Sequence, residues 1–312
     1  MSTYAASSPV QQMPTVSIVV PVYNRAELIQ PCLASLMAQT YPKECYEIIV
    51  VDDGSTDNTA ACAREMLRDW PGTFQIVQKP NGGPASARNA GFRASHADVI
   101  AFIDSDCVAE IHWVEKLIDP LASKDAAGVG GPLINVVPPG WVANYLNETS
   151  FFRHRVKHGK VDYLLTANVA FRRSALVEVN GFSEYPGVWA EDADLSFRLI
   201  QSGHTLLLTE QGLVTHYGTP SSIQALIKDL YRYGYGNAVL SRHWKNGRTP
   251  VVEFIRHGGA VVLSPLLALS HAKRVGMRRA ITFWPLIVIE HTAFICGLIK
   301  GALQTRLRGT GQ

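Results

Sequence analysis

The sequence predicts an α/β fold, in which a parallel sheet is covered by helices and followed by a helical extension. Short apolar runs alternate with helical patterns over about ninety residues, as they do in successive strand–helix units. Polar residues directly follow three of the four apolar runs. Beyond Tyr217 the chain becomes aromatic, apolar and basic. These observations predict a sheet with functional residues along one edge, and a second region of a different kind.

The expected elements follow from the pattern of apolar residues. Strands are expected over 16–21, 46–52, 74–78 and 99–103, because each run is short, apolar and bounded by polar residues. Helices are expected over 26–38, from the turn at 53–57 to about residue 70, over 85–95 and over 111–121. Trp113, in the last of these helices, is expected to be a packing residue. Later strands are expected over 205–209 and 212–216, and over 163–172 with an interruption at Asn168.

Polar side chains stand at the carboxyl ends of three predicted strands, which lie along one edge of a parallel sheet. Asn24 follows the first strand, Asp52 and Asp53 follow the second, and Asp104 and Asp106 follow the fourth. Two carboxylates one residue apart repel each other unless a cation lies between them, and oxygen ligands favour Mg²⁺ or Mn²⁺. An Asp-x-Asp also occurs in ordinary surface turns, so the metal interpretation depends on the segments around it.

The segment Asn81-Gly82-Gly83-Pro84 has two interpretations. It is either a plain loop or the opening of a helix whose amide groups and dipole bind a phosphate, with Arg88 one turn further on to add a charge-assisted contact. The sequence contains neither G-x-G-x-x-G nor a Walker lysine, which excludes the dinucleotide and P-loop fingerprints.

An acidic cluster opens a predicted helix in the second half of the chain. Glu191, Asp192 and Asp194 share its first turn, where the helix dipole favours anions, but capping explains only one of them. Trp189, just before the cluster, is either a core residue or a platform for a sugar. His216, at the end of a predicted strand, is either a surface residue or a metal ligand.

Four motifs together resemble a family 2 glycosyltransferase of the GT-A fold, a mixed Rossmann-like sheet flanked by helices. They are SIVVPVYN at 17–24, VDDGSTD at 51–57, GGPASARNAG at 82–91 and Asp104-Ser105-Asp106. Their order and spacing match as well, and the resemblance covers roughly residues 15–217. It implies an inverting transfer of a sugar from a nucleotide-diphospho-sugar, with UDP as the first expectation and GDP or dTDP as alternatives, and Mg²⁺ or Mn²⁺ as the cofactor.

The resemblance also implies roles for individual residues. The Pro21–Asn24 segment and Asp53 would hold the base and ribose, and Asp192, in the Glu-Asp pair formed with Glu191, would be the general base. The residues assigned to the nucleotide sugar are Pro21, Tyr23, Asn24, Asp52, Asp53, Gly82, Gly83, Arg88, Asp104, Ser105, Asp106, Asn168 and Trp189. Asp104 and Asp106 would hold the metal, with His216 as a third ligand, as in some GT-A enzymes.

Three regions are expected: a loose leader over 1–14, the GT-A domain over 15–220 and a helical region over 221–312. The last contains apolar stretches at 258–270 and 281–303, the second of borderline length for a membrane span. From Leu269 onward it carries seven cations against Glu290 alone. This composition favours amphipathic helices on the cytoplasmic face of a membrane, which would make the acceptor a lipid-linked or growing glycan. A helical dimer interface is the alternative.

Composition and absent motifs narrow the remaining classes. The net charge of +3 gives no reason to expect nucleic acid as a partner, and the five scattered cysteines indicate reduced thiols. No Gln-x-x-Arg-Trp is present, which argues against a processive cellulose-synthase-like enzyme. A nucleotidyltransferase would need a basic, glycine-rich loop in place of residues 21–25. A non-catalytic sugar-nucleotide sensor or membrane scaffold would not need the full set of carboxylates.

Overall fold

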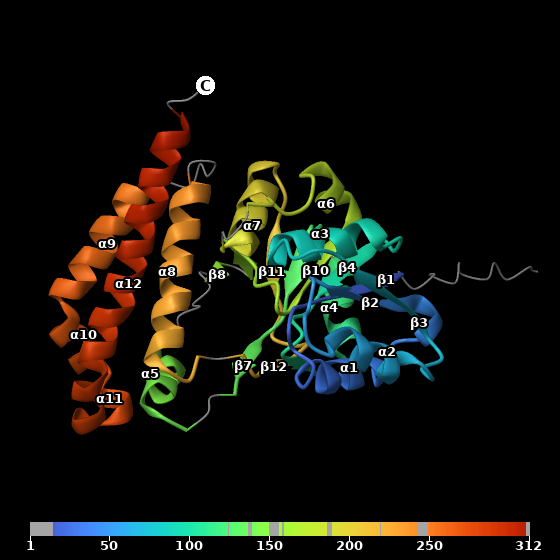
Figure 1. Cartoon of the computed structure of the whole chain (residues 1–312), viewed down its shortest axis with the longest axis horizontal. Helices are drawn as coiled ribbons and strands as arrows, with labels where there is room; N and C mark the ends of the chain where they lie inside the picture. The colour runs from blue at the N-terminus through green and yellow to red at the C-terminus, as the bar shows by residue number, and fades with distance from the viewer. Residues whose placement is uncertain are drawn as a thin grey trace, which may run out of the picture.

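The computed structural model describes residues 15–123, 125–136, 139–149, 156–157, 159–185, 189–218, 220–241 and 249–309. The leader expected over 1–14 lies outside these residues. A layered α/β part stands beside a group of long helices formed by the end of the chain (Figure 1). The described cysteines are free thiols, as expected.

The strands are β1 (Val16–Val22), β2 (Tyr46–Asp52), β3 (Thr73–Gln78), β4 (Val99–Phe102), β5 (Cys107–Ala109), β6 (Gly128–Gly130), β7 (Leu133–Asn135), β8 (Val156–Lys157), β9 (Lys160–Val161), β10 (Val169–Arg172), β11 (Leu206–Leu208) and β12 (Val214–His216). The helices are α1 (Ile29–Met37), the 3-10 turn η1 (Lys43–Cys45), α2 (Thr59–Leu67), α3 (Pro84–Ala94), α4 (Trp113–Ser123), α5 (Trp141–Thr149), α6 (Arg173–Glu178), α7 (Glu191–Gln201), α8 (Ile223–Leu240), α9 (Pro250–Val262), α10 (Ser264–Ser270), α11 (Ala272–Val275) and α12 (Met277–Gly309).

The main sheet begins as the sequence predicts and then changes direction. Within the described residues its strand order is β3-β2-β1-β4-β10-β6-β11-β9-β8. β1 pairs in parallel with β2 and β4, and β2 pairs in parallel with β3. β10 is antiparallel to β4 and β6. A second, smaller sheet has the order β5-β12-β7. The parallel half places the ends of β1, β2 and β4 along one edge.

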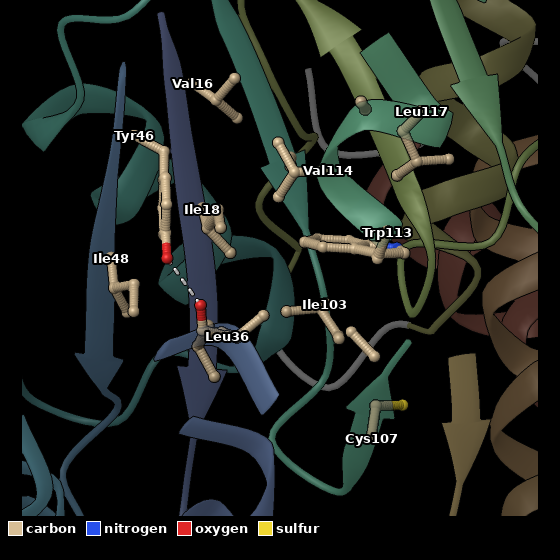
Figure 2. Packing of buried hydrophobic residues seen from close by; sticks show 14 of the residues in the cluster. Val16, Ile18, Leu36, Tyr46, Ile48, Ile103, Cys107, Trp113, Val114 and Leu117 are labelled. Carbon is tan, nitrogen blue, oxygen red and sulfur yellow. Dashed lines mark hydrogen bonds between the residues drawn. The ribbon is translucent and has the colours of Figure 1, made fainter. Parts of the chain in front are cut away.

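The strands expected from apolar runs form the centre of the core. Figure 2 shows Ile18 of β1 and Ile48 of β2 among the buried side chains between sheet and helices. Tyr46 joins this core with its ring and donates its hydroxyl to the Leu36 carbonyl at 2.9 Å. Trp113 is fully buried, which confirms it as a packing residue.

Three expected elements have a boundary in the structure that differs from the expected one by three residues or more. The strand expected over 163–172 begins only at Val169, because a turn closed by the Asn168 N–H and the Leu165 carbonyl precedes it. The helix expected over 26–38 begins at Ile29, after a turn closed by the Arg25 carbonyl. The helix expected to reach about residue 70 ends at Leu67.

The helical region is built around α8. Its start is capped by Ser222, whose side chain accepts from the Ala225 N–H. α8 lies between α12 and the α/β part, and α9 and α10 pack on α12 (Figure 1). α5 is tied to α12 by hydrogen bonds from Trp141 to the Thr282 carbonyl and from Tyr145 to Glu290.

Among the described residues, the segment Met277–Gln304 is long and apolar enough to cross a membrane. Of the two expected apolar stretches, the second lies in this helix. The first lies in a pair of helical segments, Pro250–Val262 and Ser264–Val275, whose axis bends by 74° between them. The pair would qualify as one broken span by length and composition only.

Candidate active site

The carboxyl edge of the parallel strands carries the predicted polar residues, and several of them hold one another. Asp52 is buried at the end of β2, where it accepts from the Ser55 N–H at 2.9 Å and from the Gln78 side chain at 3.2 Å. Asn24 has a left-handed backbone, with φ of 50°, and accepts from the Thr56 N–H at 2.8 Å. These contacts fix the two loops that follow β1 and β2 against each other.

The amide groups of the glycine loop before α3 donate hydrogen bonds to a carboxylate of the chain itself. Asp53, which is buried, accepts from the N–H groups of Gly82 at 3.0 Å and Gly83 at 2.8 Å, and pairs with Lys79 at 2.5 Å. The amides expected to bind a phosphate are therefore occupied by a carboxylate of the chain itself. These contacts favour the plain-loop interpretation of residues 81–84 over the phosphate-binding one.

Arg88 connects the two halves of the site. From α3, its guanidinium donates to Asp104 at 2.8 Å and to Glu191 at 2.6 Å, and the arginine side chain is only 5% exposed. Burial alone would lower the pKa of Arg88, but the charges of Asp104 and Glu191 raise it well above its ordinary value. The arginine is thus a fixed cation between the Asp-x-Asp loop and the start of α7.

The pKa of Asp192 is that expected of a base that works near neutral pH. Burial, and then the neighbouring charge of Glu191, raise the pKa of Asp192 to about 7. Its Oδ1 accepts from the Ala193 N–H at 2.7 Å, and the charge of Arg88 opposes the rise. A carboxylate with this pKa is available as a proton acceptor in roughly half of the molecules at neutrality.

Asp106 and His216 approach each other across β5 and β12. His216 Nε2 lies 3.5 Å from Asp106 Oδ1, while its Nδ1 is 2.9 Å from the Asn135 side chain. Burial and the charge of Asp104 raise the pKa of Asp106 above its ordinary value. A Cβ at Gly218 would lie 2.2 Å from Asp106 Oδ2, so the Asp106 carboxylate packs directly against the Gly218 backbone.

Among the described residues, Asp106, Cys107 and His216 have ligand atoms within 4.8 Å of one another, a spacing that could hold a metal ion. Cys107 is fully buried, and burial raises the pKa of its thiol far above the ordinary value. A thiol in this state is a poor ligand. The oxygen and nitrogen ligands of the group are therefore those of Asp106 and His216.

Asn168 belongs to the packing of the sheets. It is 1% exposed. Its amide donates to the carbonyls of Pro132 and Gly212, both at 2.8 Å, and its oxygen accepts from the Trp113 indole at 2.8 Å. Because both amide hydrogens are used within the protein, these contacts favour the structural interpretation of Asn168 over a contact with the donor sugar.

Trp189 packs against α8. The guanidinium of Arg232 lies 4.8 Å from the centre of its ring, and the Tyr233 ring meets it edge to face at 5.7 Å. These contacts favour the packing interpretation of Trp189. The remaining predicted residues line the same sheet edge: Pro21 is half-buried, Tyr23 is exposed and Ser105 is buried.

The sequence did not reveal the contacts between the two halves of the site. The ion pair of Arg88 with Glu191 and the packing of Tyr233 on Trp189 join segments that are far apart in the chain. The tyrosines at 231, 233 and 235 were visible as a stripe, but nothing in the stripe indicates what it packs against.

This strand order, with polar residues along the carboxyl edge of its parallel strands, is that of the GT-A fold of glycosyltransferases. The family described as "Glycosyl transferase family 2" matches residues 17–179, and "Glycosyl transferase family group 2" matches residues 99–299. The chain belongs to glycosyltransferase family 2 and is a nucleotide-sugar-dependent enzyme, as the sequence motifs predict.

Curated relatives agree with this assignment. Glycosyltransferase AglE of Haloferax volcanii is 30% identical over 226 residues, which cover 72% of this chain and 73% of that protein. The pre-mycofactocin glycosyltransferase of Mycobacterium tuberculosis is 33% identical over 214 residues, covering 64% of this chain but 42% of that protein.

Solved structures show the same fold. The mannosyltransferase PcManGT of Pyrobaculum calidifontis, in complex with GDP-Man and Mn²⁺, aligns over 94% of this chain and 88% of its own, with a TM-score of 0.66 and 19% identity. Staphylococcus aureus TarS 1-349, in complex with UDP-GlcNAc, aligns over 94% and 92%, with a TM-score of 0.58 and 17% identity.

Proposed function

We propose that this enzyme transfers a sugar, with inversion, from a nucleotide-diphospho-sugar to a hydroxyl group of a lipid-linked or glycan acceptor. The observation that carries the proposal is the position of Arg88, which binds Asp104 on the donor side and Glu191 on the base side. Donor and acceptor chemistry are thereby held in one rigid unit, which is the arrangement that a direct displacement requires.

Asp192 is the general base of the proposed reaction. Its carboxylate takes the proton of the acceptor hydroxyl as that oxygen bonds to the anomeric carbon. The bond from the anomeric carbon to the phosphate oxygen breaks, and the nucleoside diphosphate leaves with the electron pair. A single attack from the face opposite the leaving group inverts the anomeric centre. The pKa of about 7 keeps Asp192 able to accept this proton near neutrality.

Asp104, Asp106 and His216 would hold the divalent cation. The 3.5 Å approach of His216 Nε2 to Asp106 Oδ1 supports this role. A bound Mg²⁺ or Mn²⁺ would neutralise the charge that develops on the leaving diphosphate. Arg88, already paired with Asp104, orients that carboxylate toward the donor.

The donor is expected to carry UDP or GDP. The two structural neighbours named above hold GDP-Man and UDP-GlcNAc respectively, so likeness of fold does not choose between the bases. UDP remains the expectation from the sequence motifs, and Asp53 and Asn24 lie at the loops where the base and ribose are expected.

The acceptor side faces a membrane in this proposal. The outer helices expose large apolar side chains, which are Val251, Val252, Phe254, Ile255, Val262, Leu263, Leu266, Leu267, Leu269, Met277, Ile281 and Trp284. Soluble proteins rarely expose so many together. Lys273 and Arg274 on α11, and Arg278 at the start of α12, add cations at one end. This combination supports α9 to α12 lying in an anionic, cytoplasmic membrane interface.

The proposal is tested by measuring nucleoside diphosphate release from UDP-, GDP- and dTDP-sugars with a membrane lipid extract as the acceptor source. We expect one donor to be consumed in the presence of acceptor and Mn²⁺, and Asp192→Asn to lose activity by about 10²–10⁴-fold. Release at the same rate by Asp192→Asn would overturn the assignment of the base. Binding of a donor without any turnover would favour a sensor.

A further inference from the structure

Two glycines of α8 lie on opposite faces of the helix because they are two residues apart, and each meets a backbone. A Cβ at Gly234 would lie 2.0 Å from the Phe294 carbonyl oxygen of α12. A Cβ at Gly236 would lie 1.6 Å from the Trp189 carbonyl oxygen, beside the acidic cluster. α8 is therefore in backbone contact with α12 on one side. On the other side it contacts the segment of Trp189 and Ala190 that leads into the acidic cluster, here called the catalytic segment.

Glycines of α12 complete the contact with α8. A Cβ at Gly297 would lie 1.9 Å from the Tyr231 carbonyl oxygen, and one at Gly301 would lie 2.7 Å from that of Tyr235. No flexible side chain separates the helices at these points, so the pair moves as a unit. Figure 1 shows α8 as the element between α12 and the α/β part.

The catalytic segment has a strained backbone where α8 touches it. Ala190, between Trp189 and Glu191, has φ of 83° and ψ of 24°, a left-handed conformation that is strained for a residue other than glycine. Such a conformation persists only where its surroundings impose it. Gly236 lies against the Trp189 carbonyl, and Arg232 and Tyr233 lie against its ring.

Tyr233 also lies close to the acidic cluster. Burial, followed by the charges of Asp192 and Glu191, raises the pKa of Tyr233 well above its ordinary value. The charged groups that act on Asp192 are Glu191 on its own helix, Arg88 on α3 and Asp104 after β4. Tyr233 is the residue of α8 on which the charge of Asp192 acts in turn.

We propose that α8 is a positioning element for the catalytic base: Gly236 and Tyr233 hold the Trp189–Ala190 segment in its strained form and so orient Asp192, while α12 fixes α8 in place. The inference rests on the proposed function of Asp192 as the base. Gly236 and Tyr233 are positioning residues, because they act through Trp189. A displacement of about 1 Å at a reacting group can cost about 10²-fold in rate.

The first test is Gly236→Ala, compared with Gly258→Ala. The control makes the same change inside α9, where a Cβ meets nothing within 4 Å. We expect Gly236→Ala to lower kcat by about 10²-fold with the donor KM within about threefold of wild type, and Gly258→Ala to leave both unchanged. Equal kcat for Gly236→Ala and wild type would overturn the proposal. So would a loss confined to the donor KM.

The second test uses Tyr233→Ala and Tyr233→Phe, and it remains decisive if Gly236→Ala does not fold. Removing the ring admits water to Asp192, so the acid limb of the kcat profile should move to lower pH in Tyr233→Ala. Tyr233→Phe should have the kcat of wild type, and its acid limb should lie at the same pH as that of wild type. A lower kcat with the limb unmoved in Tyr233→Ala would show a merely structural role and contradict the proposal.

The two levels of the account fail separately. If wild type turns over donor but Asp192→Asn does so equally well, the proposed base is wrong, whatever the α8 variants do. If Asp192→Asn is inactive while Gly236→Ala and Tyr233→Ala behave as wild type, only the positioning role of α8 is wrong. Donor-induced thermal stabilisation, measured on every variant, confirms that each has folded.

Discussion

Arg88 and Glu191 are 103 residues apart in the sequence, yet their side chains form a buried ion pair of 2.6 Å. The same guanidinium binds Asp104 at 2.8 Å. The arginine therefore joins the Asp-x-Asp loop, proposed to bind the donor, to the start of α7, proposed to carry the base. A buried cation between two carboxylates is costly to remove, since each partner would be left uncompensated.

Arg88→Ala should destabilise the protein by about 3–5 kcal/mol, because it leaves Asp104 and Glu191 as unpaired charges. Arg93→Ala on the same helix is the control. The Arg93 side chain is 64% exposed and lies 3.5 Å from Glu184, and such surface pairs contribute at most about 1 kcal/mol. Chemical denaturation of both variants measures the difference. Equal losses would show that the Arg88 pairs contribute no more than a surface contact.

The rate of transfer should rise with pH through an acid limb near pH 7. Asp192 must be ionised to accept the acceptor proton, and its pKa is about 7 because of burial and the charge of Glu191. Measuring kcat against pH at saturating donor tests this. A limb near the ordinary aspartate value of about 4 would contradict the environment described for Asp192.

Asp192→Asn should be inactive and yet more stable than wild type at alkaline pH. The pKa of Asp192 is higher folded than unfolded, so its contribution to stability is complete below about pH 4 and is lost as the pH rises through about 7. The amide removes this dependence, and the gain above about pH 8 is at most about 4 kcal/mol. Melting temperatures of both proteins across this range test it, and a constant difference would contradict the sign.

The strands of the parallel sheet could be predicted closely because burial on both faces leaves a local apolar signature. β2 covers the predicted residues and β1 extends one residue beyond them. Asp53 shows where local reasoning stops. Its position after β2 was readable, but its contacts with Gly82 and Gly83 depend on how two loops meet in space. Asn168 likewise was visible as an interruption, while its partners come from other segments.

The apolar outer helices should bind anionic membranes. Vesicles of phosphatidylglycerol and phosphatidylcholine should carry the protein in flotation, and vesicles of phosphatidylcholine alone should carry less of it. Val262→Glu with Leu266→Glu, at positions 79% and 65% exposed, should abolish flotation. Val177→Glu is the control, because Val177 is 60% exposed on α6. Flotation retained by the double variant would contradict a membrane-binding face on α9 and α10, and a concentration-dependent dimer without vesicles would favour a protein interface instead.

The most direct test of metal-dependent donor binding is thermal unfolding with UDP-, GDP- and dTDP-sugars, each with Mn²⁺ and with EDTA. A donor at 100 times its Kd should add about 2.7 kcal/mol of stability. We predict that one donor stabilises wild type only with Mn²⁺, and that Asp106→Asn and His216→Ala lose the effect. Equal stabilisation with EDTA, or in Asp106→Asn, would contradict a metal held by these residues, and no stabilisation by any donor would contradict the donor site itself.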